Sequence, residues 1–389
     1  MRRPSVIQQW LALACALSIT VAAVMVYERR IEAAADAPAD SGDGHGAVDV
    51  PAPPEASAVP EAVDVPAPPE ASAVPEAVDM PDVPDPPVPS ETDSADIAAV
   101  APPPFPDQFE PSPNEVQADA KRLGAAVAHQ ITNYGRNSSV TDLAALVTAD
   151  PARVDALARE AATVHHPGMW SRGTIEYAQL GGHRDDRISI MVVVRQELGK
   201  QGTSDAERAE TRTMDVRLAR GASGVWEFEQ LASAGGQPVA RPPNLSPLAA
   251  SVVDDPRIDL PDTAIWDIYS GQTDPALHEV MLDIAERTPY SVIVLKTGHP
   301  HNVFGTDRVS NHTVGRAVDI HEVNSALVID SHDTTSSMYA LSEWLVSRLD
   351  ITEFGSPWLF DDAVAHNFTD EVHHDHLHVG VFSEDHVAG

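Results

Sequence analysis

The sequence predicts an α+β protein that follows an N-terminal transmembrane helix and a disordered, proline-rich linker. Three observations support this fold class. Val6 to Tyr27 is a run of about 20 mostly apolar residues, enough to cross a hydrocarbon core of roughly 30 Å. Residues 48–62 read VDVPAPPEASAVPEA and are repeated letter for letter at 63–77. From Pro113 onward, two successive segments combine helical patterns with runs of β-forming residues.

The composition of the chain disfavours some classes of binding partner and excludes one class of metal site. The chain has 389 residues and a net charge of −34, which disfavours nucleic acid and anionic lipid surfaces, because both select clusters of Lys and Arg. The single cysteine, Cys15, lies inside the apolar run, so neither an intramolecular disulfide nor a cysteine-based zinc site can form. Any metal must be held by His and carboxylate side chains.

Residues 1–35 are expected to be an uncleaved membrane anchor. Arg2 and Arg3 precede the apolar run and a YERR sequence ends it, whereas a cleavable signal has a shorter core followed closely by small residues. A cleaved signal is the alternative. The long acidic segment that follows favours a single-pass cell-membrane protein whose C-terminal bulk is extracytoplasmic.

Residues 36–112 are expected to be a disordered linker rich in Pro, Ala and Glu. Proline at this density removes the hydrogen bonds of helices and sheets, so an extended, polyproline-like spacer is predicted. At about 3.1 Å per residue it reaches at most roughly 200 Å or a little more. It then serves as a tether between a membrane and a folded domain, or as filler without any length requirement.

Residues 113–238 are predicted to form an α+β domain with three helices followed by an antiparallel meander. This order resembles the NTF2-like (cystatin-like) cone fold of some envelope proteins, which implies binding or spacing rather than catalysis, with protein partners unknown. His165 and His166 have no ligand partner at a telling spacing, and ARPPNLSP at 240–247 ends the segment. The expected helices cover 114–131, 140–147 and 152–164, and the expected strands 173–182, 186–198, 210–221 and 224–233.

Residues 248–389 concentrate histidine. Of the 17 histidines of the chain, 12 fall from His278 onward, which indicates a use for imidazole there. The same stretch alternates apolar helical and strand patterns, so a second α+β domain is predicted. Its helices are expected within 277–287 and 336–349, and its strands within 291–298, 351–358 and the closing HHDHLHVGV.

The sequence SNHTVGRAVDI places His312 and Asp319 seven residues apart across Gly315. On one strand this odd separation would direct the two side chains to opposite faces. The glycine instead permits a turn at His312, after which Ala317 and Asp319 share one strand face. His312 and Asp319 can then converge.

The closing HHDHLHVGV supplies a second cluster. His376 and His378 are two residues apart, so on a strand both side chains point to the same side, while Leu377 and Val379 point into the core. This adds a third ligand and a neighbour. Two imidazoles and one carboxylate suit Zn²⁺ and leave a fourth coordination position for water, which is the arrangement of a catalytic zinc. Hydrolysis of an amide is the natural reaction.

These residues also carry a family resemblance. SNHTVGRAVDI fits the pattern S-x-H-x-x-G-x-A-x-D, and HDHLHVGV fits the terminal H-x-H strand, of the LAS-type zinc peptidases. These include D-Ala-D-Ala carboxypeptidases, peptidoglycan endopeptidases and the hedgehog signalling domain. The resemblance covers roughly residues 250–383, and the two motifs occur in the family's order about 60 residues apart. It implies that His312, Asp319 and His378 are the metal ligands.

The resemblance also implies the catalytic groups. His376 would stabilise the tetrahedral oxyanion or help to hold the attacking water. Family members place a general-base carboxylate three residues before the last ligand, where this chain has Asp375. Many members have Glu there, so the shorter Asp requires an ordered water or a tight loop, and the last strand must begin at about residue 376. Glu371 and His374 are the substitutes otherwise.

The candidate substrate-binding residues are chosen by their position in the sequence relative to the first ligand. Carboxypeptidase members hold the peptide carboxylate with a basic residue upstream of the first ligand, and Lys296 matches that place. Arg308 and Arg316 are the alternative candidates for this role. Ser310 is expected to hydrogen-bond within the turn. Lys lacks the bidentate fork of Arg, which leaves endopeptidase action open. His299 and His301 in TGHPHN are read as exposed loop residues rather than residues of a cleft, and the solvated reading is kept for His321, His332, His366 and His386.

The expected function is therefore that of a membrane-anchored, extracytoplasmic zinc metallopeptidase, a carboxypeptidase or endopeptidase that cleaves peptidoglycan stem peptides. The alternative is a catalytically inactive, zinc-containing binding module of the cell envelope, favoured by Asp at the base position and by Lys at 296. In a third reading the middle domain assembles envelope complexes and the C-terminal domain is vestigial.

Overall fold

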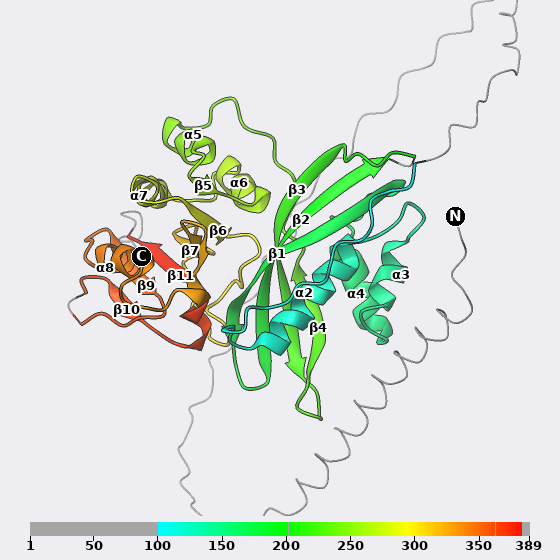
Figure 1. Ribbon diagram of the computed structural model, residues 1–389, viewed down its shortest axis with the longest axis horizontal. Helices are drawn as coiled ribbons and strands as arrows, with labels where there is room; N and C mark the ends of the chain where they lie inside the picture. Colours follow the sequence, from blue (N-terminus) through cyan, green and yellow to red (C-terminus); the bar gives the residue numbers. More distant parts are fainter. Residues whose placement is uncertain (1–99, 201, 362, 383–389) are drawn as a thin grey trace, which may run out of the picture. The chain divides into compact units, whose positions relative to one another are not determined.

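The computed structural model describes residues 100–200, 202–361 and 363–382. These residues form a mixed α+β structure with two sheets, as the composition of the two segments predicts (Figure 1). The expected anchor 1–35 and the first part of the expected linker, 36–99, lie outside them. Within the described ranges, no helix is both long enough and apolar enough to cross a membrane.

Three helices begin the fold at the places that the sequence indicates. Helix α2 covers Ala118–Thr132, α3 covers Val140–Ala145 and α4 covers Pro151–Ala161. The side chain of Ser139 accepts a hydrogen bond from the backbone N–H of Asp142 and so caps α3. Asp150 caps α4 in the same way, ahead of a proline in the first turn, which explains where α4 begins.

The four predicted strands pair in sequence order. They form an antiparallel meander β1-β2-β3-β4, with β1 at an open edge of the pairing. Strands β1 and β3 begin before the expected residues 173 and 210, whereas β2 and β4 begin after the expected residues 186 and 224. Their bounds are Met169–His183 for β1, Arg187–Lys200 for β2, Arg208–Arg220 for β3 and Trp226–Ser233 for β4.

Strand β2 is buried on both faces. Ile190 and Val192 belong to the core that the first sheet shares with α2 and α4, while Met191 and Val193 point to the opposite face. There they pack against residues of the second sheet. This two-sided burial explains why β2 reads as one continuous apolar run rather than an alternating one.

The packed part of the chain begins before residue 113. Residues 101–112 form no helix or strand, and Phe109 packs against the core of the first sheet and α2. The guanidinium of Arg172 lies 4.3 Å from the ring centre of Phe105 and donates a hydrogen bond of 2.6 Å to the carbonyl of Pro103. The end of the proline-rich stretch is thus held by specific contacts, so composition alone places the start of the fold too late.

The second sheet has the order β10-β9-β11-β7-β6-β5, with β8 paired to β7. It is mixed: β5 runs parallel to β6 and β10 parallel to β9, and the other pairs are antiparallel. The strands are β5 Ile258–Asp259, β6 Tyr290–Val294, β7 Ala317–Val323, β8 Ala326–Leu327, β9 Ile351–Gly355, β10 His366–Phe368 and β11 Leu377–Val381.

Helices cover one face of this sheet. The predicted helices appear as α7, Pro275–Ala285, and α8, Ser337–Val346. The sequence reasoning missed α5, Pro247–Asp254, and α6, Asp262–Tyr269, because both have only eight residues and the first adjoins the proline-rich ARPPNLSP. Figure 1 shows α5, α7 and α8 on the side of the second sheet that faces away from β1 and β2.

The alternation of side chains in β7 and β11 is as predicted. Val318 of β7 and Leu377 and Val379 of β11 lie in the core beneath the helices. Asp319 and His378 therefore point to the opposite face of the sheet. That face lies toward the first sheet.

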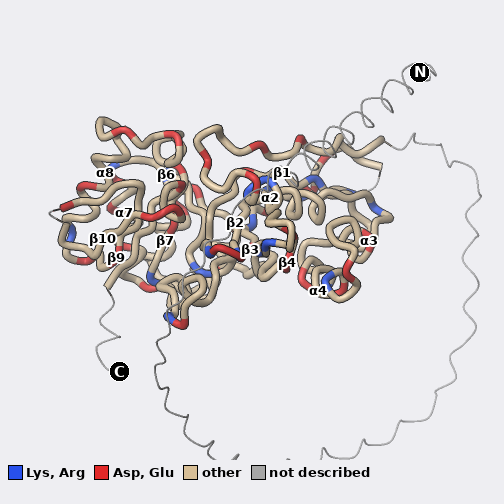
Figure 2. Tube along the Cα trace, turned by 90° about the horizontal axis from the view of Figure 1, so that it is seen from below, with Lys and Arg blue, Asp and Glu red and all other residues tan. Residues whose placement is uncertain are grey.

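The two sheets pack against each other. Ile293 and Val294 of β6 contact the β2 residues Met191 and Val193 in a small apolar cluster. Residues from both sheets belong to one compact unit of the chain, and the domain boundaries at 113–238 and 248–389 stay predictions. Charges of both signs occur along the segments of both sheets (Figure 2).

Candidate metal centre

A tight turn between β6 and β7 positions His312. Gly315 has φ +73°, and a methyl group on it would lie 2.0 Å from the carbonyl oxygen of Gln272, so this turn requires glycine. The carbonyl of Leu295 lies 2.8 Å from Nδ1 of His312. Because a carbonyl only accepts, Nδ1 carries the proton and Nε2 presents its lone pair. The predicted turn is thus present and fixes the imidazole.

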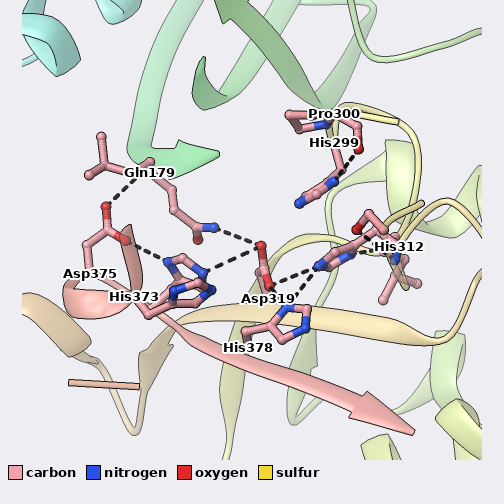
Figure 3. A network of polar contacts seen from close by, with 12 residues as sticks. Gln179, His299, Pro300, His312, Asp319, His373, Asp375 and His378 are labelled. Carbon is pink, nitrogen blue, oxygen red and sulfur yellow. Dashed lines mark hydrogen bonds and ion pairs between the residues drawn. The ribbon is translucent and has the colours of Figure 1, made fainter. Parts of the chain in front are cut away.

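Strand pairing brings His378 to Asp319. The two residues are direct partners in the antiparallel pair of β11 and β7. Nδ1 of His378 lies 2.9 Å from Oδ1 of Asp319 and 3.2 Å from Nε2 of His312, and His312 Nε2 lies 3.1 Å from the same Oδ1. The three atoms form a nearly equilateral triangle, shown in Figure 3. The structure therefore brings the three predicted ligands together.

The donor set of this triangle fits a zinc ion. Bonds of about 2.0 to 2.1 Å in a tetrahedral site place the ligand atoms about 3.3 Å from one another, close to the distances found here. Lone pairs of a carboxylate and of His312 Nε2 face each other at 3.1 Å, which is repulsive unless a proton or a cation lies between them. His312, Asp319 and His378 are also buried, at 0, 1 and 8% exposed.

The surroundings of Asp319 and His378 shift the pKa values of both side chains. Burial alone would raise the pKa of Asp319, but His312 and His376 hold it well below its usual range. Burial lowers the pKa of His378, while hydrogen bonds with Asp319 and Glu353 outweigh burial and raise it to about 9. The carboxylate of Glu353 on β9 lies 3.6 Å from Nε2 of His378, the ring nitrogen that is not part of the triangle.

Asp375 does not face the triangle. It ends a 3-10 helix, Glu371–His374, directly before β11, so the last strand begins at Leu377, as the predicted base position required. Its Oδ1 lies 2.6 Å from Nδ1 of His376, and its Oδ2 accepts a hydrogen bond of 2.9 Å from the backbone N–H of Leu180. The side chain is completely buried.

Lys121 of α2 neutralises Asp375. Its ammonium lies 2.5 Å from Oδ2 of Asp375 and also pairs with Glu115, and the side chains of Lys121, Glu115 and Asp375 are all fully buried. Burial raises the pKa of Asp375, but Lys121 and His376 outweigh it and lower the pKa below its usual value. The carboxylate therefore orients His376 in place of reaching a bound molecule directly.

Two imidazoles remain beside the triangle. Nε2 of His376 lies 3.8 Å from Oδ2 of Asp319, so this ring spans from Asp375 to the site. Nδ1 of His373 is held by Asp370 at 2.7 Å, and burial lowers the pKa of His373. A methyl group on Gly355 would lie 2.4 Å from the His373 ring, so glycine in β9 provides the space for it.

These groups line a cleft of about 430 Å³. Of the predicted substrate-binding residues, Arg308 and Ser310 line it, and Arg308 pairs with Glu353 at 2.8 Å. Lys296 is not among the described residues that line it; its backbone N–H donates to Asp267. The walls come from both sheets, since residues 180–183 of β1 face the loop and strand residues of the second sheet.

Glu371 and His374, the alternatives to Asp375 as general base, lie outside the cleft. Glu371 accepts a hydrogen bond from Gln117 and pairs with His183 at 2.9 Å, outside the triangle. His374 contacts His332 through its carbonyl. Neither side chain lines the cleft that the described residues form around Asp319.

Several residues of the site carried no sequence signal. Gln179 of β1 donates from Nε2 to Oδ2 of Asp319 at 2.9 Å, across 140 positions of sequence. Lys121 and Glu353 are likewise brought in only by tertiary packing. His299 was read as an exposed loop residue, but its ring stacks on His312 at 4.0 Å between centroids and lines the cleft. The ligand atoms of His299, His312 and Asp319 all lie within 4.8 Å of one another.

His321 also differs from its solvated reading. It is 8% exposed and stacks on Tyr177 of β1, with 4.9 Å between ring centroids. Its strand, β7, is covered by the first sheet at this point, which the sequence of β7 alone does not reveal.

Comparisons of the chain with protein-family models, with curated proteins and with solved structures each gave no match. The geometry of the described residues is therefore the observation from which a function is inferred, and the likeness to LAS-type peptidases stays a prediction from the two motifs.

Proposed function

We propose that this chain is a zinc-dependent peptidase whose metal ligands are His312 Nε2, Asp319 Oδ1 and His378 Nδ1. The observation that carries the proposal is the buried triangle of these three atoms, with sides of 2.9 to 3.2 Å. A zinc ion bound there would lower the pKa of a water molecule to about 7 and polarise a substrate carbonyl. Three protein ligands leave a position for these groups on the cleft side.

His376 is proposed to accept the proton of the attacking water. The Asp375 carboxylate holds the proton on Nδ1 of His376, which leaves the Nε2 lone pair directed toward Asp319. Proton transfer by such an oriented imidazole contributes typically about 10²- to 10⁴-fold to a rate. The proton is then returned to the leaving amine, and a carboxylate and an amine are the products. Asp375 thus becomes a positioning residue rather than the base.

The substrate is proposed to be a peptide of the peptidoglycan stem type. The two motifs of the LAS-type family support this class, as does the exposed guanidinium of Arg308, which can pair with a substrate carboxylate. The cleft adjoins a wider hollow of about 1130 Å³ that shares His183 and Phe304 with it. That space suits a substrate attached to a polymer better than a free dipeptide, which favours endopeptidase action.

We extend the proposal to the fold families of the two segments and to the cellular location of the chain. We assign residues 113–238 to the NTF2-like cone fold on the order of three helices and a four-stranded meander, and 248–389 to the hedgehog and DD-peptidase-like fold on its motifs. The apolar run and the acidic linker support an extracytoplasmic domain tethered to the cell membrane. Peptidoglycan is then within reach of the cleft, and the middle domain is available for protein partners.

A second candidate is a zinc-containing binding module without turnover. The burial of Asp375 against Lys121 favours it, because the carboxylate that family members use as a base is here occupied by a buried cation. Under this alternative the same ligands bind zinc, and the cleft recognises cell-wall peptides without cleaving them.

One assay separates the two candidates. The full-length chain, purified in detergent and loaded with zinc, is incubated with purified peptidoglycan fragments, and newly released amines are measured. His378→Ala removes a ligand, and His166→Ala is the control, since His166 contacts Arg208 and is not among the residues that line the cleft. The peptidase proposal predicts amine release by the wild type and the control only. If the wild type binds zinc and the fragments but releases no amine, the peptidase proposal fails and the binding module is supported.

A further inference from the structure

We propose that Gln179, from the first sheet, is a positioning residue of the metal centre in the second sheet. The inference rests on the zinc site proposed above and extends it. It means that the middle segment of the chain completes the metal centre and is more than a spacer beside it.

The contact itself is specific. Gln179 lies on β1 and is completely buried, and its amide lies 2.9 Å from Oδ2 of Asp319. The amide atom at this distance is Nε2, which can only donate, and Oδ2 of Asp319 accepts the hydrogen bond. The orientation of the amide is thereby fixed by chemistry.

This hydrogen bond decides which oxygen of Asp319 is available to the metal. Oδ2 is occupied by Gln179, while Oδ1 faces both ligand histidines at 3.1 and 2.9 Å. A carboxylate without this restraint can rotate, and it then presents Oδ1 less often. Partners of this kind orient metal ligands, and their loss typically weakens metal binding by about 10- to 100-fold.

The oxygen of the amide makes no hydrogen bond that competes with this contact. Oε1 of Gln179 is buried and has no hydrogen-bond partner among the described residues. Figure 3 shows the amide between Asp319 and the histidine rings, with only its nitrogen engaged. A buried carbonyl oxygen without a partner is unfavourable, and removing Oε1 in a variant breaks no hydrogen bond within the described residues.

The position of β1 is fixed on both sides of Gln179. Tyr177 stacks on His321 of β7, and the backbone N–H of Leu180 donates to Asp375. Tyr177, Gln179 and Leu180 thus contact two residues of β7 and the residue that follows the 3-10 helix. Gln179 is held in place by these contacts and does not depend on its own hydrogen bond to approach Asp319.

The test measures zinc affinity rather than turnover. The full-length chain in detergent competes with a chromogenic chelator for zinc, as wild type, as Gln179→Met and as Gln196→Met. Methionine keeps the side-chain volume and removes both polar atoms. Gln196 is the matched control, because it is also completely buried and lies on the neighbouring strand β2. Its Oε1 likewise has no partner among the described residues, but its Nε2 bonds to Val164 and Ser171.

Gln179→Met is expected to bind zinc about 10- to 100-fold more weakly than the wild type, and Gln196→Met within about twofold of it, with both variants folded by circular dichroism. Equal affinities of Gln179→Met and wild type would overturn the inference, as would an equal loss in Gln196→Met. If Gln179→Met does not fold, Gln179→Glu supplies the measurement, because a second carboxylate at Oδ2 repels Asp319 and alters the affinity if the contact matters. A wild type that binds zinc but cleaves no peptide would refute only the peptidase proposal.

Discussion

His378 lies directly opposite Asp319 in the antiparallel pair of β11 and β7, with 2.9 Å between Nδ1 and Oδ1. The pairing depends on register, because a slip of one residue would turn His378 into the core and bring Leu377 or Val379 to the site. The apolar residues on the other face of β11 set that register by packing under the helices. Core packing and ligand geometry are therefore specified by the same alternation.

Replacement of Asp375 is predicted to reduce turnover without removing the metal. In Asp375→Asn the neutral amide no longer fixes the proton on Nδ1 of His376, so the Nε2 lone pair is not held toward the site. We expect amine release from peptidoglycan fragments to fall by about 10²-fold or more, with zinc affinity within threefold of the wild type. Unchanged turnover would show that Asp375 does not orient a catalytic imidazole.

Zinc is predicted to stabilise the folded chain. A ligand that binds only the folded state at 100 times its dissociation constant adds about 2.7 kcal/mol to the free energy of unfolding. Thermal unfolding of the full-length chain should therefore shift to higher temperature on addition of zinc and return on addition of a chelator. Asp319→Ala should show no such shift. A zinc-induced shift that persists in Asp319→Ala would place the metal elsewhere.

Lys121 is predicted to be essential for stability. Its removal in Lys121→Met leaves the buried carboxylates of Glu115 and Asp375 without a counter-charge, which should lower the free energy of unfolding by about 3 to 5 kcal/mol. Arg122→Met is the control on the same helix, since the ion pairs of Arg122 are exposed, and it should change stability by less than about 1 kcal/mol. Denaturant titrations of the two variants measure the difference. Equal losses would contradict the buried network.

Acidification is predicted to destabilise the chain through His278. This histidine of α7 contacts Thr273 at 2.8 Å in the loop that packs against Gly315, and burial lowers its pKa despite the nearby Asp274. The unfolded chain then binds the proton first as the pH falls below about 6.5, so this contribution to stability is present above that pH and is lost toward the lower, folded-state pKa. In His278→Gln the free energy of unfolding should depend less on pH between about 5 and 7. An unaltered dependence would refute the assignment.

Local patterns predicted most of the elements and the convergence of three candidate ligands. Helices α2, α3, α4, α7 and α8, the meander and the closing strand follow from periodicity, capping residues and turns, which act over a few positions. The convergence of His312, Asp319 and His378 follows from a glycine turn and strand alternation. Short helices without a long periodic pattern, such as α6, were missed.

The surroundings of the ligands were not predictable in this way. Gln179 and Lys121 reach the site only because β2 packs on β6, and an amide or a lysine in a strand or helix has no signal that identifies a distant carboxylate. The direction of Asp375 was left open by the sequence. It was decided by a buried cation from a helix 254 positions earlier in the chain.

The most direct measurement is anomalous diffraction at the zinc edge from crystals of the zinc-loaded chain. The proposed centre predicts one strong peak within about 2.0 to 2.2 Å of His312 Nε2, Asp319 Oδ1 and His378 Nδ1. Crystals without a peak between these three atoms, or with zinc bound only at other residues, would contradict it.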